Sequence, residues 1–409
     1  MSVIQKYRER VKKYGRKFVW TMILRNKIYR PVDKEVTRIM SIFLRKHRLA
    51  NVIIIESHND FDSNGGTFYS YLIKNGLNRE YKIVWLIKNS KPRKLPSNVY
   101  CYNIFKPSIK KSYFLCRAKI MTADDIITPK VRTDQKSFFL RHGAGGLKNV
   151  KGKAVVIPDS LDYILGMSEK YAPIETDQLM LKYPDKRFIY LGFPSHDLLF
   201  QDNSDELLKI TDMEFRKVIL WMPTFRRGGG VDREDSCITY PLGIPLFHDQ
   251  NEYKDINQFL ADYNILLVIK IHPMQDLSDL KAIEMTNITI LTGNDVKKKN
   301  IDNYRLMSCC DAMISDYSGA AYEFLQLDRP IAYVLDDMNE YKLGFVVENI
   351  HDLIAGHEIY NIFDLKAFIK SVSDSKDEYA EKRQTIRDYV YKYHDGNNCR
   401  RLAKFMEIE

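Results

Sequence analysis

Short apolar runs alternate with helix-like stretches along most of the chain. They cover residues 51–57, 81–87, 118–124, 137–143, 163–168 and 187–193, and then 217–224, 265–272, 288–293, 311–316 and 330–335. Each run is bounded by polar, glycine or proline residues, which is typical of a strand. Parallel strands are buried on both faces and are therefore apolar throughout. The pattern predicts an α/β protein with two doubly wound parallel sheets in tandem and a boundary near 198–216.

The first 48 residues follow a different pattern. Residues 1–30 hold ten basic residues and one acid, so they carry +9 of the formal net charge of +10. Apolar side chains recur there at steps of three and four, which predicts a basic amphipathic helix: they are Ile4, Tyr7, Val11, Tyr14 and Phe18. Such a helix lies on an anionic membrane surface or packs on its own protein.

The remaining composition narrows the class of protein. A chain of 409 residues exceeds what one core usually reaches, so we predict a basic helical segment at 1–48 and α/β domains at 49–205 and 206–409. Six cysteines without a CxxC pair indicate a reducing, cytoplasmic setting. The positive charge is confined to the N-terminus instead of spread over the folded body, so nucleic acid is not an expected partner. No apolar stretch is long enough to span a bilayer.

Polar motifs follow four of the predicted strands. They are His142 in "RHGAGG", Thr224 and Arg226 in "PTFRR", Lys270 and His272 in "KIHP", and residues 315–319 in "SDYSG". Ligands of parallel α/β sheets bind at the carboxyl ends of the strands, so the cleft between the two domains is the expected site. A helix beginning after Ser318 suits a diphosphate, and a lysine with a histidine on one strand face suits phosphate oxygens.

Each motif also has a purely structural interpretation. Ser318 is equally suited to cap a helix, and Asp316 to make a turn. His272 fits a satisfied structural histidine, and Arg226 with residues 227–230 fits either a phosphate-binding loop or a basic surface turn. No metal-ligand constellation stands out. The only adjacent carboxylate pairs near strand ends are Asp124–Asp125 and Asp336–Asp337.

The order of these motifs resembles that of a known family. "ES…DSNGG", "RHGAGGLKNV", "GFPSHDLL", "WMPTFRR", "IKIHP", "ISDYSGAAYEFLQLDRPIAYVLDDMNEY" and "AGHE" are similar to the CDP-glycerol glycerophosphotransferases of teichoic-acid and capsule synthesis, the TagB/TagF-like group, over about 50–395. The chain departs from the pattern at Lys148, which stands alone after the glycine loop, and at Ser195, where a basic residue is common. The basic N-terminal segment has no counterpart in the resemblance.

The resemblance implies a GT-B-like fold of two facing domains and transfer of a polyol phosphate from CDP-glycerol or CDP-ribitol. We expect a lipid-linked glycan or polyol-phosphate acceptor. From the basic N-terminal helix we expect the protein at the inner face of the membrane, and from the lack of a metal-ligand pattern we expect no cofactor or metal. His142 would be the catalytic base, assisted by His272. The implied donor-binding residues are Thr224, Arg226, Lys270, Ser315, Asp316, Ser318, Gly319 and Glu323, and the implied acceptor-binding residues are Gly65, Gly66, Gly145 and Lys148.

Two other functions remain open at this stage. The same fold class serves sugar-nucleotide glycosyltransferases and UDP-sugar epimerases, because a fold does not determine a reaction. A membrane-bound binding protein with an inactive GT-B-like site is the second alternative. The presence of both His142 and His272 with an intact SDYSG motif argues against the second.

Overall fold

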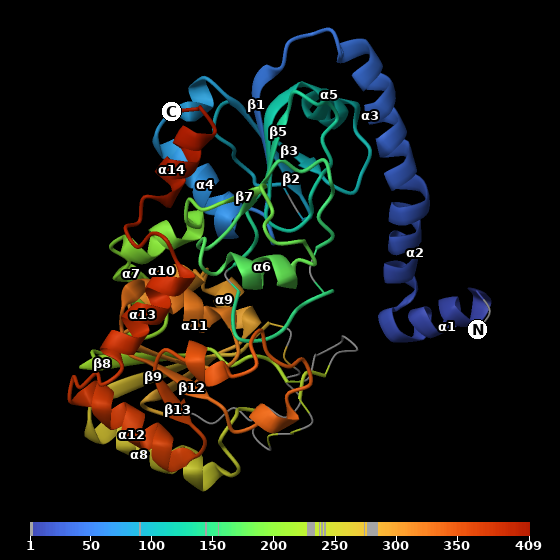
Figure 1. Cartoon of the computed structure of the whole chain (residues 1–409). Helices are drawn as coiled ribbons and strands as arrows, with labels where there is room; N and C mark the ends of the chain where they lie inside the picture. Colours follow the sequence, from blue (N-terminus) through green and yellow to red (C-terminus); the bar gives the residue numbers. More distant parts are fainter. Residues whose placement is uncertain are drawn as a thin grey trace.

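Two separate parallel sheets, one above the other in Figure 1, form the body of the molecule. The computed structural model describes residues 3–89, 91–143, 145–153, 155–226, 234–236, 238, 240, 243–273, 275 and 285–409. The first sheet has the strand order β3-β2-β1-β4-β5-β6-β7 and the second β10-β9-β8-β11-β12-β13. Their pairings are parallel, which confirms the predicted fold class.

The strands lie close to the predicted runs. The first sheet contains β1 (Ala50–Glu56), β2 (Lys82–Ile87), β3 (Val99–Asn103), β4 (Ala118–Ala123), β5 (Lys136–Phe139), β6 (Tyr163–Leu165) and β7 (Phe188–Ile189). The second contains β8 (Lys217–Trp221), β9 (Ile265–Lys270), β10 (Ile288–Leu291), β11 (Ala312–Ser315), β12 (Ile331–Val334) and β13 (His357–Ile359). The sequence analysis missed β3 and β13. Both are edge strands; four of the five residues of β3 are only half-buried, and β13 contains His357 and Glu358.

Helices cover both faces of each sheet. They are α4 (Ser63–Lys74), α5 (Ile109–Arg117), α6 (Ala172–Gln178), α7 (Asp205–Leu208), α8 (Gln250–Asp262), α9 (Gly293–Lys298), α10 (Asn303–Ser308), α11 (Gly319–Phe324), α12 (Ile362–Ser373), α13 (Ala380–Val390) and α14 (Asn398–Phe405). Alternate residues of β1 face α4 on one side and α5 on the other. In the second sheet, α11 covers one face, and α8 and α12 cover the other. Burial on both faces explains the uninterrupted apolar runs.

The C-terminal segment returns to the first sheet. The carboxylate of Asp197, in the turn η3 (Pro194–Phe200), accepts the N–H groups of Asn398 and Cys399 at 2.8 Å each. The ring of Phe405 then packs on Phe138 and Tyr163 of the first sheet. The predicted domain range 206–409 does not anticipate that α14, near the C-terminus, packs beside α4 of the first domain (Figure 1).

The N-terminal segment is a set of helices that runs along the side of the first domain (Figure 1). It comprises α1 (Val3–Tyr14), α2 (Arg16–Leu24), the π-helical turn η1 (Arg25–Tyr29) and α3 (Arg30–Leu44). Gly15 has a φ of 80°, which ends α1, so the predicted apolar stripe does not continue along one helix. Tyr14 and Phe18 instead pack across the break, with ring centroids 5.4 Å apart. The side chain of Ile4 lies outside the described residues.

Polar contacts hold one face of α3 on α5. The ammonium of Lys111 lies 2.9 Å from the carboxylate of Asp33, and the hydroxyls of Thr37 and Ser112 are 2.8 Å apart. Among the described helices, none combines the length and the apolar character needed to cross a bilayer.

Candidate active site between the two domains

His142 follows β5 in a turn whose preceding residue is strained. Arg141 has a φ of 65°, a region that residues other than glycine rarely adopt. Its guanidinium pairs with the buried carboxylate of Glu175 on α6 and lies 5.7 Å from the centroid of the Phe193 ring. Glu175 in turn accepts the N–H of Met167 at 2.9 Å. Anchoring Arg141 therefore sets the direction in which the chain leaves β5 toward His142.

Asn64 clamps the same turn from α4. Its side-chain amide donates to the carbonyl oxygens of Leu140 and Arg141 at 3.0 and 2.9 Å. Its carbonyl oxygen accepts both the N–H and the hydroxyl of Ser195. Asn64 is fully buried, and all its hydrogen-bonding capacity is used. The sequence analysis missed this residue, although it precedes the glycine pair in "DSNGG".

The structure gives Gly65 and Gly66 roles in close packing. The N–H of Gly65 donates to the carboxylate of Asp124 at 2.8 Å, and that of Gly66 to the carbonyl of Asp62 at 2.8 Å. A Cβ on Gly66 would lie 2.3 Å from the carbonyl oxygen of Phe61. Both amides are thus occupied within the protein, and an acceptor contact at these glycines stays a prediction.

The loop after His142 reaches the second domain. The N–H of Lys148 donates to the carbonyl of Tyr317 at 3.3 Å, and that of Asn149 to the carbonyl of Gly344 at 3.0 Å. In return, the N–H of Val346 donates to the carbonyl of Leu147 at 2.9 Å. Gly146 lies against the start of α11, where a Cβ would be 2.7 Å from the nitrogen of Gly319. One loop therefore links His142 to the SDYSG turn.

We expect Gly146→Ala to destabilise this junction by about 1–3 kcal/mol, because the new methyl group meets backbone atoms that cannot rotate away. The matched variant is Gly145→Ala, whose Cβ would meet the Tyr171 ring at an ordinary 3.8 Å. Thermal unfolding of both variants measures the difference. A loss of stability at Gly145 equal to that at Gly146 would contradict the proposed close approach.

A buried ion network occupies the ends of β8, β11 and β12. The guanidinium of Arg226 contacts Asp316 at 2.7 Å and Asp337 at 2.7 and 3.0 Å. Asp316 also accepts the N–H and hydroxyl of Thr224 at 2.8 and 2.5 Å, and Asp337 accepts the hydroxyl of Tyr317 at 3.0 Å. Burial opposes the charge of Arg226, but the two carboxylates outweigh it and raise its pKa. Thr224, Arg226 and Asp316 thus hold one another. Residues 227–230 lie outside the described residues.

The rest of the SDYSG segment also makes internal contacts. The hydroxyl of Ser315 donates to the carbonyl of Met222 at 3.0 Å. The hydroxyl of Ser318 caps α11 by accepting the N–H of Ala320 at 3.2 Å. The carboxylate of Glu323 contacts the buried ring of His196 and the hydroxyl of Tyr304. These contacts match the structural interpretations of the motif, and donor binding by Ser315, Ser318, Gly319 and Glu323 stays a prediction.

Lys270 has a different environment. It ends β9 next to β8 and is 5% exposed, yet no ion pair joins its ammonium to a carboxylate of the described residues. Burial alone lowers its pKa to about 8. His272, two residues later, packs its ring 5.0 Å from that of Phe225, in the segment that follows β8. A buried cation at the carboxyl end of a strand is a suitable partner for an anionic ligand.

His142 itself belongs to a cluster with His58 and Asp125. The two rings stack with centroids 4.7 Å apart, and the candidate ligand atoms of the three residues lie within 4.8 Å of one another. However, the ammonium of Lys88 contacts Asp125 at 2.9 Å and would repel a cation, so we assign no metal to this cluster. Although His142 is at the surface, desolvation and the neighbouring His58 lower its pKa. The nearby carboxylate of Asp125 acts to raise the pKa of His142.

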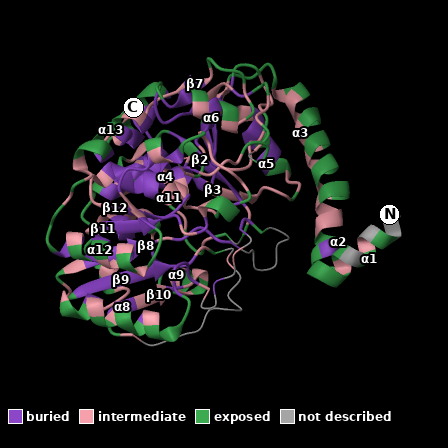
Figure 2. Ribbon diagram, turned by 60° about the horizontal axis from the view of Figure 1, so that its bottom comes forward, coloured by how far each residue is buried: buried purple, intermediate pink, exposed green. Residues whose placement is uncertain are grey.

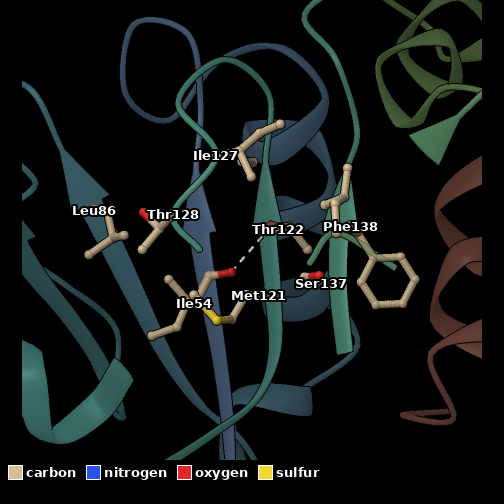
Figure 3. A pocket seen from close by; sticks show the side chains of 10 residues that line it. Ile54, Leu86, Met121, Thr122, Ile127, Thr128, Ser137 and Phe138 are labelled. Atoms are coloured by element: carbon tan, nitrogen blue, oxygen red, sulfur yellow. Dashed lines mark hydrogen bonds between the residues drawn. The ribbon is translucent and has the colours of Figure 1, made fainter. Parts of the chain in front are cut away.

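An apolar pocket in the first sheet is separate from this chemistry (Figure 3). Its lining consists of Ile54, Leu86, Met121, Thr122, Ala123, Ile127, Thr128, Ser137, Phe138 and Leu161. None of these side chains titrates near neutral pH, and the hydroxyl of Thr122 donates to the carbonyl of Ile54 at 3.3 Å. The pocket is therefore not a candidate for catalysis.

Comparison with known proteins identifies the family. The sequence matches the family "CDP-Glycerol:Poly(glycerophosphate) glycerophosphotransferase" over residues 38–407. The chain belongs to this family. The teichoic acid glycerol-phosphate primase of Bacillus subtilis (strain 168) is 26% identical over 73% of this chain and 76% of its own length. The teichoic acid ribitol-phosphate polymerase TarL of Staphylococcus aureus is 22% identical over 98% of this chain and 69% of its own length.

The family's fold is also found. A solved structure of the wall teichoic acid polymerase TagF superposes with a TM-score of 0.68 at 18% identity, covering 100% of this chain and 98% of that one. This confirms the GT-B-like fold expected from the resemblance. Together with the family match, it confirms that the protein is a transferase of the CDP-glycerol glycerophosphotransferase type. The expected roles of individual residues stay predictions.

Proposed function

We propose that this protein transfers glycerol phosphate or ribitol phosphate from its CDP-linked form to a hydroxyl of a lipid-linked glycan or polyol-phosphate acceptor, with release of CMP and with His142 as general base. The observation that carries the proposal is the loop linking the domains. It begins at His142 of the first domain and hydrogen-bonds, through Lys148, to Tyr317 of the SDYSG turn in the second. A base beside the donor motif is the arrangement that this transfer requires.

The surroundings of His142 suit a base. Desolvation and the adjacent His58 lower its pKa, so the ring is neutral and able to accept a proton near physiological pH. Deprotonating the attacking hydroxyl is the chemical task, because the phosphoryl transfer itself depends mainly on positioning and electrostatic stabilisation. Arg226 is paired with Asp316 and Asp337, and its contact with the donor phosphates stays a prediction.

Lys270 is the group that we assign to the donor diphosphate. Its ammonium is buried without an ion-pair partner among the described residues, so a bound anion would supply the missing countercharge. His272 lies on the same strand end and is proposed to assist at the same phosphates. Lys270 is the last residue of β9, the neighbour of β8 in the second sheet, and His272 follows two residues later.

We expect donor affinity to depend on pH through Lys270. In the free protein its pKa is about 8, and a bound diphosphate raises it, so affinity is constant below pH 8 and falls by up to about tenfold per pH unit above it. Lys270→Met should weaken CDP-glycerol binding, remove this pH dependence and stabilise the unliganded protein. Calorimetric titration between pH 7 and 9.5 measures the effect, with the exposed Lys254→Met as control. Unaltered affinity in the Lys270 variant would reject the assignment.

The reaction is tested directly by incubating the purified protein with CDP-glycerol or CDP-ribitol and a panel of lipid-linked acceptors. CMP release that depends on both donor and acceptor supports the proposal. Release with UDP-sugars instead would favour the glycosyltransferase alternative. Binding of a CDP-polyol without turnover on any acceptor would favour an inactive binding protein.

We further propose that the N-terminal helices hold the enzyme on an anionic membrane. One face of α3 packs on α5, whereas the opposite face is exposed to solvent (Figure 2). Among the side chains that the structure describes, the exposed large apolar ones of the segment are Tyr14, Phe18, Trp20, Ile28, Val32, Ile39, Ile42 and Phe43. Exposed apolar side chains on a segment whose residues 1–30 include ten basic residues suit a surface of acidic headgroups.

We expect the full-length protein to co-sediment with vesicles containing phosphatidylglycerol at low salt and to dissociate near molar salt, because the electrostatic attraction is screened. Ile39→Asp/Phe43→Asp should reduce binding at every salt concentration, since it places two charges on the apolar face. Phe363→Asp on α12 is the matched control, because Phe363 is 82% exposed and Phe43 is 74% exposed. The proposal would be contradicted if the Phe363→Asp control lost as much vesicle binding as the Ile39→Asp/Phe43→Asp variant. It would also be contradicted if the full-length protein bound neutral vesicles as well as anionic ones.

A further inference from the structure

His58 stands beside the proposed base but has no place in the mechanism so far. It follows β1, and its ring stacks on that of His142 with a centroid distance of 4.7 Å and an interplanar angle of 20°. Its Nδ1 lies 3.8 Å from the Oδ2 atom of Asp125, which follows β4. The strands β1, β4 and β5 are neighbours in the sheet, so their carboxyl ends bring the three side chains together.

Lys88 fixes the geometry of this group. Its ammonium, at the end of β2, contacts Oδ2 of Asp125 at 2.9 Å and the buried carboxylate of Glu56 at 2.7 Å. It also donates to the carbonyl oxygens of Ser57 and His58 at 3.0 and 2.8 Å. A single cation therefore binds the backbone that carries His58 and the carboxylate that faces it.

Glu56 completes the support from below. Its Oε2 accepts the N–H groups of Asp124, Asp125 and Ile126 at 3.1, 3.0 and 3.1 Å. The segments after β1, β2 and β4 are thus joined through two buried or half-buried charges, Glu56 and Lys88. Because Lys88 and Glu56 each make several buried or half-buried contacts, they hold His58 and Asp125 in place more firmly than one exposed ion pair would.

The charged groups around His142 act on it in opposite senses. His58, whose ring stacks on that of His142, and Arg141, which precedes His142 and pairs with Glu175, disfavour protonation of His142. The carboxylate of Asp125 and the backbone of Asp124 favour one. From the second domain, the carboxylate of Glu323 faces Gly143, where a Cβ would lie 3.3 Å from Oε1.

We propose that His58 and Asp125 are positioning residues for the transfer: His58 orients the ring of His142 and keeps it neutral before reaction, and Asp125 stabilises the imidazolium formed during it. This inference rests on the proposed function of His142 as base. In the step, the acceptor O–H bond breaks and its proton passes to the imidazole. The oxygen bonds to the β-phosphorus, and the bond from that phosphorus to the CMP oxygen breaks, with CMP taking the electron pair.

The inference predicts shifts of opposite sign. In His58→Phe, which retains a stacking ring without a titratable nitrogen, the pKa of His142 should rise by about 0.5–1 unit. In Asp125→Asn it should fall by a similar amount, and Asp125→Glu should restore it. Proton–nitrogen NMR titration of histidine-labelled full-length protein measures these values without reference to activity. His248→Phe, at an exposed histidine of the second domain, should cause no shift.

The pKa that governs the acidic limb of the kcat/KM profile should change together with the NMR pKa of His142. It should rise in His58→Phe and fall in Asp125→Asn. Shifts of the same sign, or none, would overturn the inference even if His142→Ala were inactive. Full activity of His142→Ala would instead defeat the proposed base and leave the NMR shifts standing. Stoichiometric binding of Zn²⁺ or Mn²⁺ that moves the His58 and His142 signals together would replace the inference with a metal site.

Discussion

Replacing His142 with alanine is expected to lower turnover by about 10²- to 10⁴-fold and to leave donor affinity nearly unchanged, as follows from the loss of a general base. The variant should remain folded, because His142 is a surface residue and the turn that carries it is held by Asn64 and by the Arg141–Glu175 pair. Steady-state kinetics with CDP-glycerol and calorimetric donor titration separate the two effects.

The control for this variant is His248→Ala, an exposed histidine before α8. It should retain normal kinetics. A folded His142→Ala protein with normal turnover would exclude the proposed base. A variant that loses donor affinity as well as turnover would point to His142 as a donor ligand, in which case its place in the mechanism changes.

The fold was largely accessible from the sequence because parallel strands covered on both faces leave a local signal. The run 51–57 is one example, since Ile53 and Ile55 face α4 and Val52 and Ile54 face α5. The edge strands β3 and β13 lack that signal. The break at Gly15 was missed because the apolar spacing continues across it, and the return of α14 depends on contacts with Asp197 that lie about 200 residues away.

Part of the candidate site could also be predicted from the sequence, because its residues follow recognisable strands. Residues at strand ends are recognisable, and His142, Thr224, Lys270 and Ser315 do lie at or just after strand ends. Their partners are not recognisable, because they are set by tertiary contacts. The local sequence does not distinguish Asn64, His58 and Lys88 from ordinary loop or strand-end residues. Only the order of the strands in the sheet brings them close to His142.

Arg226 shows how this limit changes an interpretation. The sequence fits either a phosphate-binding loop or a basic surface turn at this residue, and the family resemblance implies donor binding. Its actual partners, Asp316 and Asp337, lie 90 and 111 residues further along the chain. The acidic pair Asp336–Asp337 was noticed in the sequence, but nothing local assigns one of its carboxylates to Arg226.

Arg226→Met is therefore expected to destabilise the second domain by about 3–5 kcal/mol, because it leaves Asp316 and Asp337 buried without their countercharge. Hydrogen exchange should rise in the peptides that cover β11 and β12, whose ends carry these carboxylates. The matched control is Lys370→Met, which breaks an exposed pair with Asp374 and should leave exchange unchanged.

Donor binding provides the opposing outcome for the same variant. If Arg226 were mainly a phosphate ligand, Arg226→Met would weaken CDP-glycerol binding while exchange in β11 and β12 stayed normal. If the ion network is the main role of Arg226, hydrogen exchange increases already in the free protein. Any loss of donor affinity is then a consequence of the displaced turn at Tyr317, whose hydroxyl donates to Asp337. Arg226→Lys sharpens the comparison, because it retains one charge but cannot reach both carboxylates with paired N–H groups, so it should recover part of the lost stability.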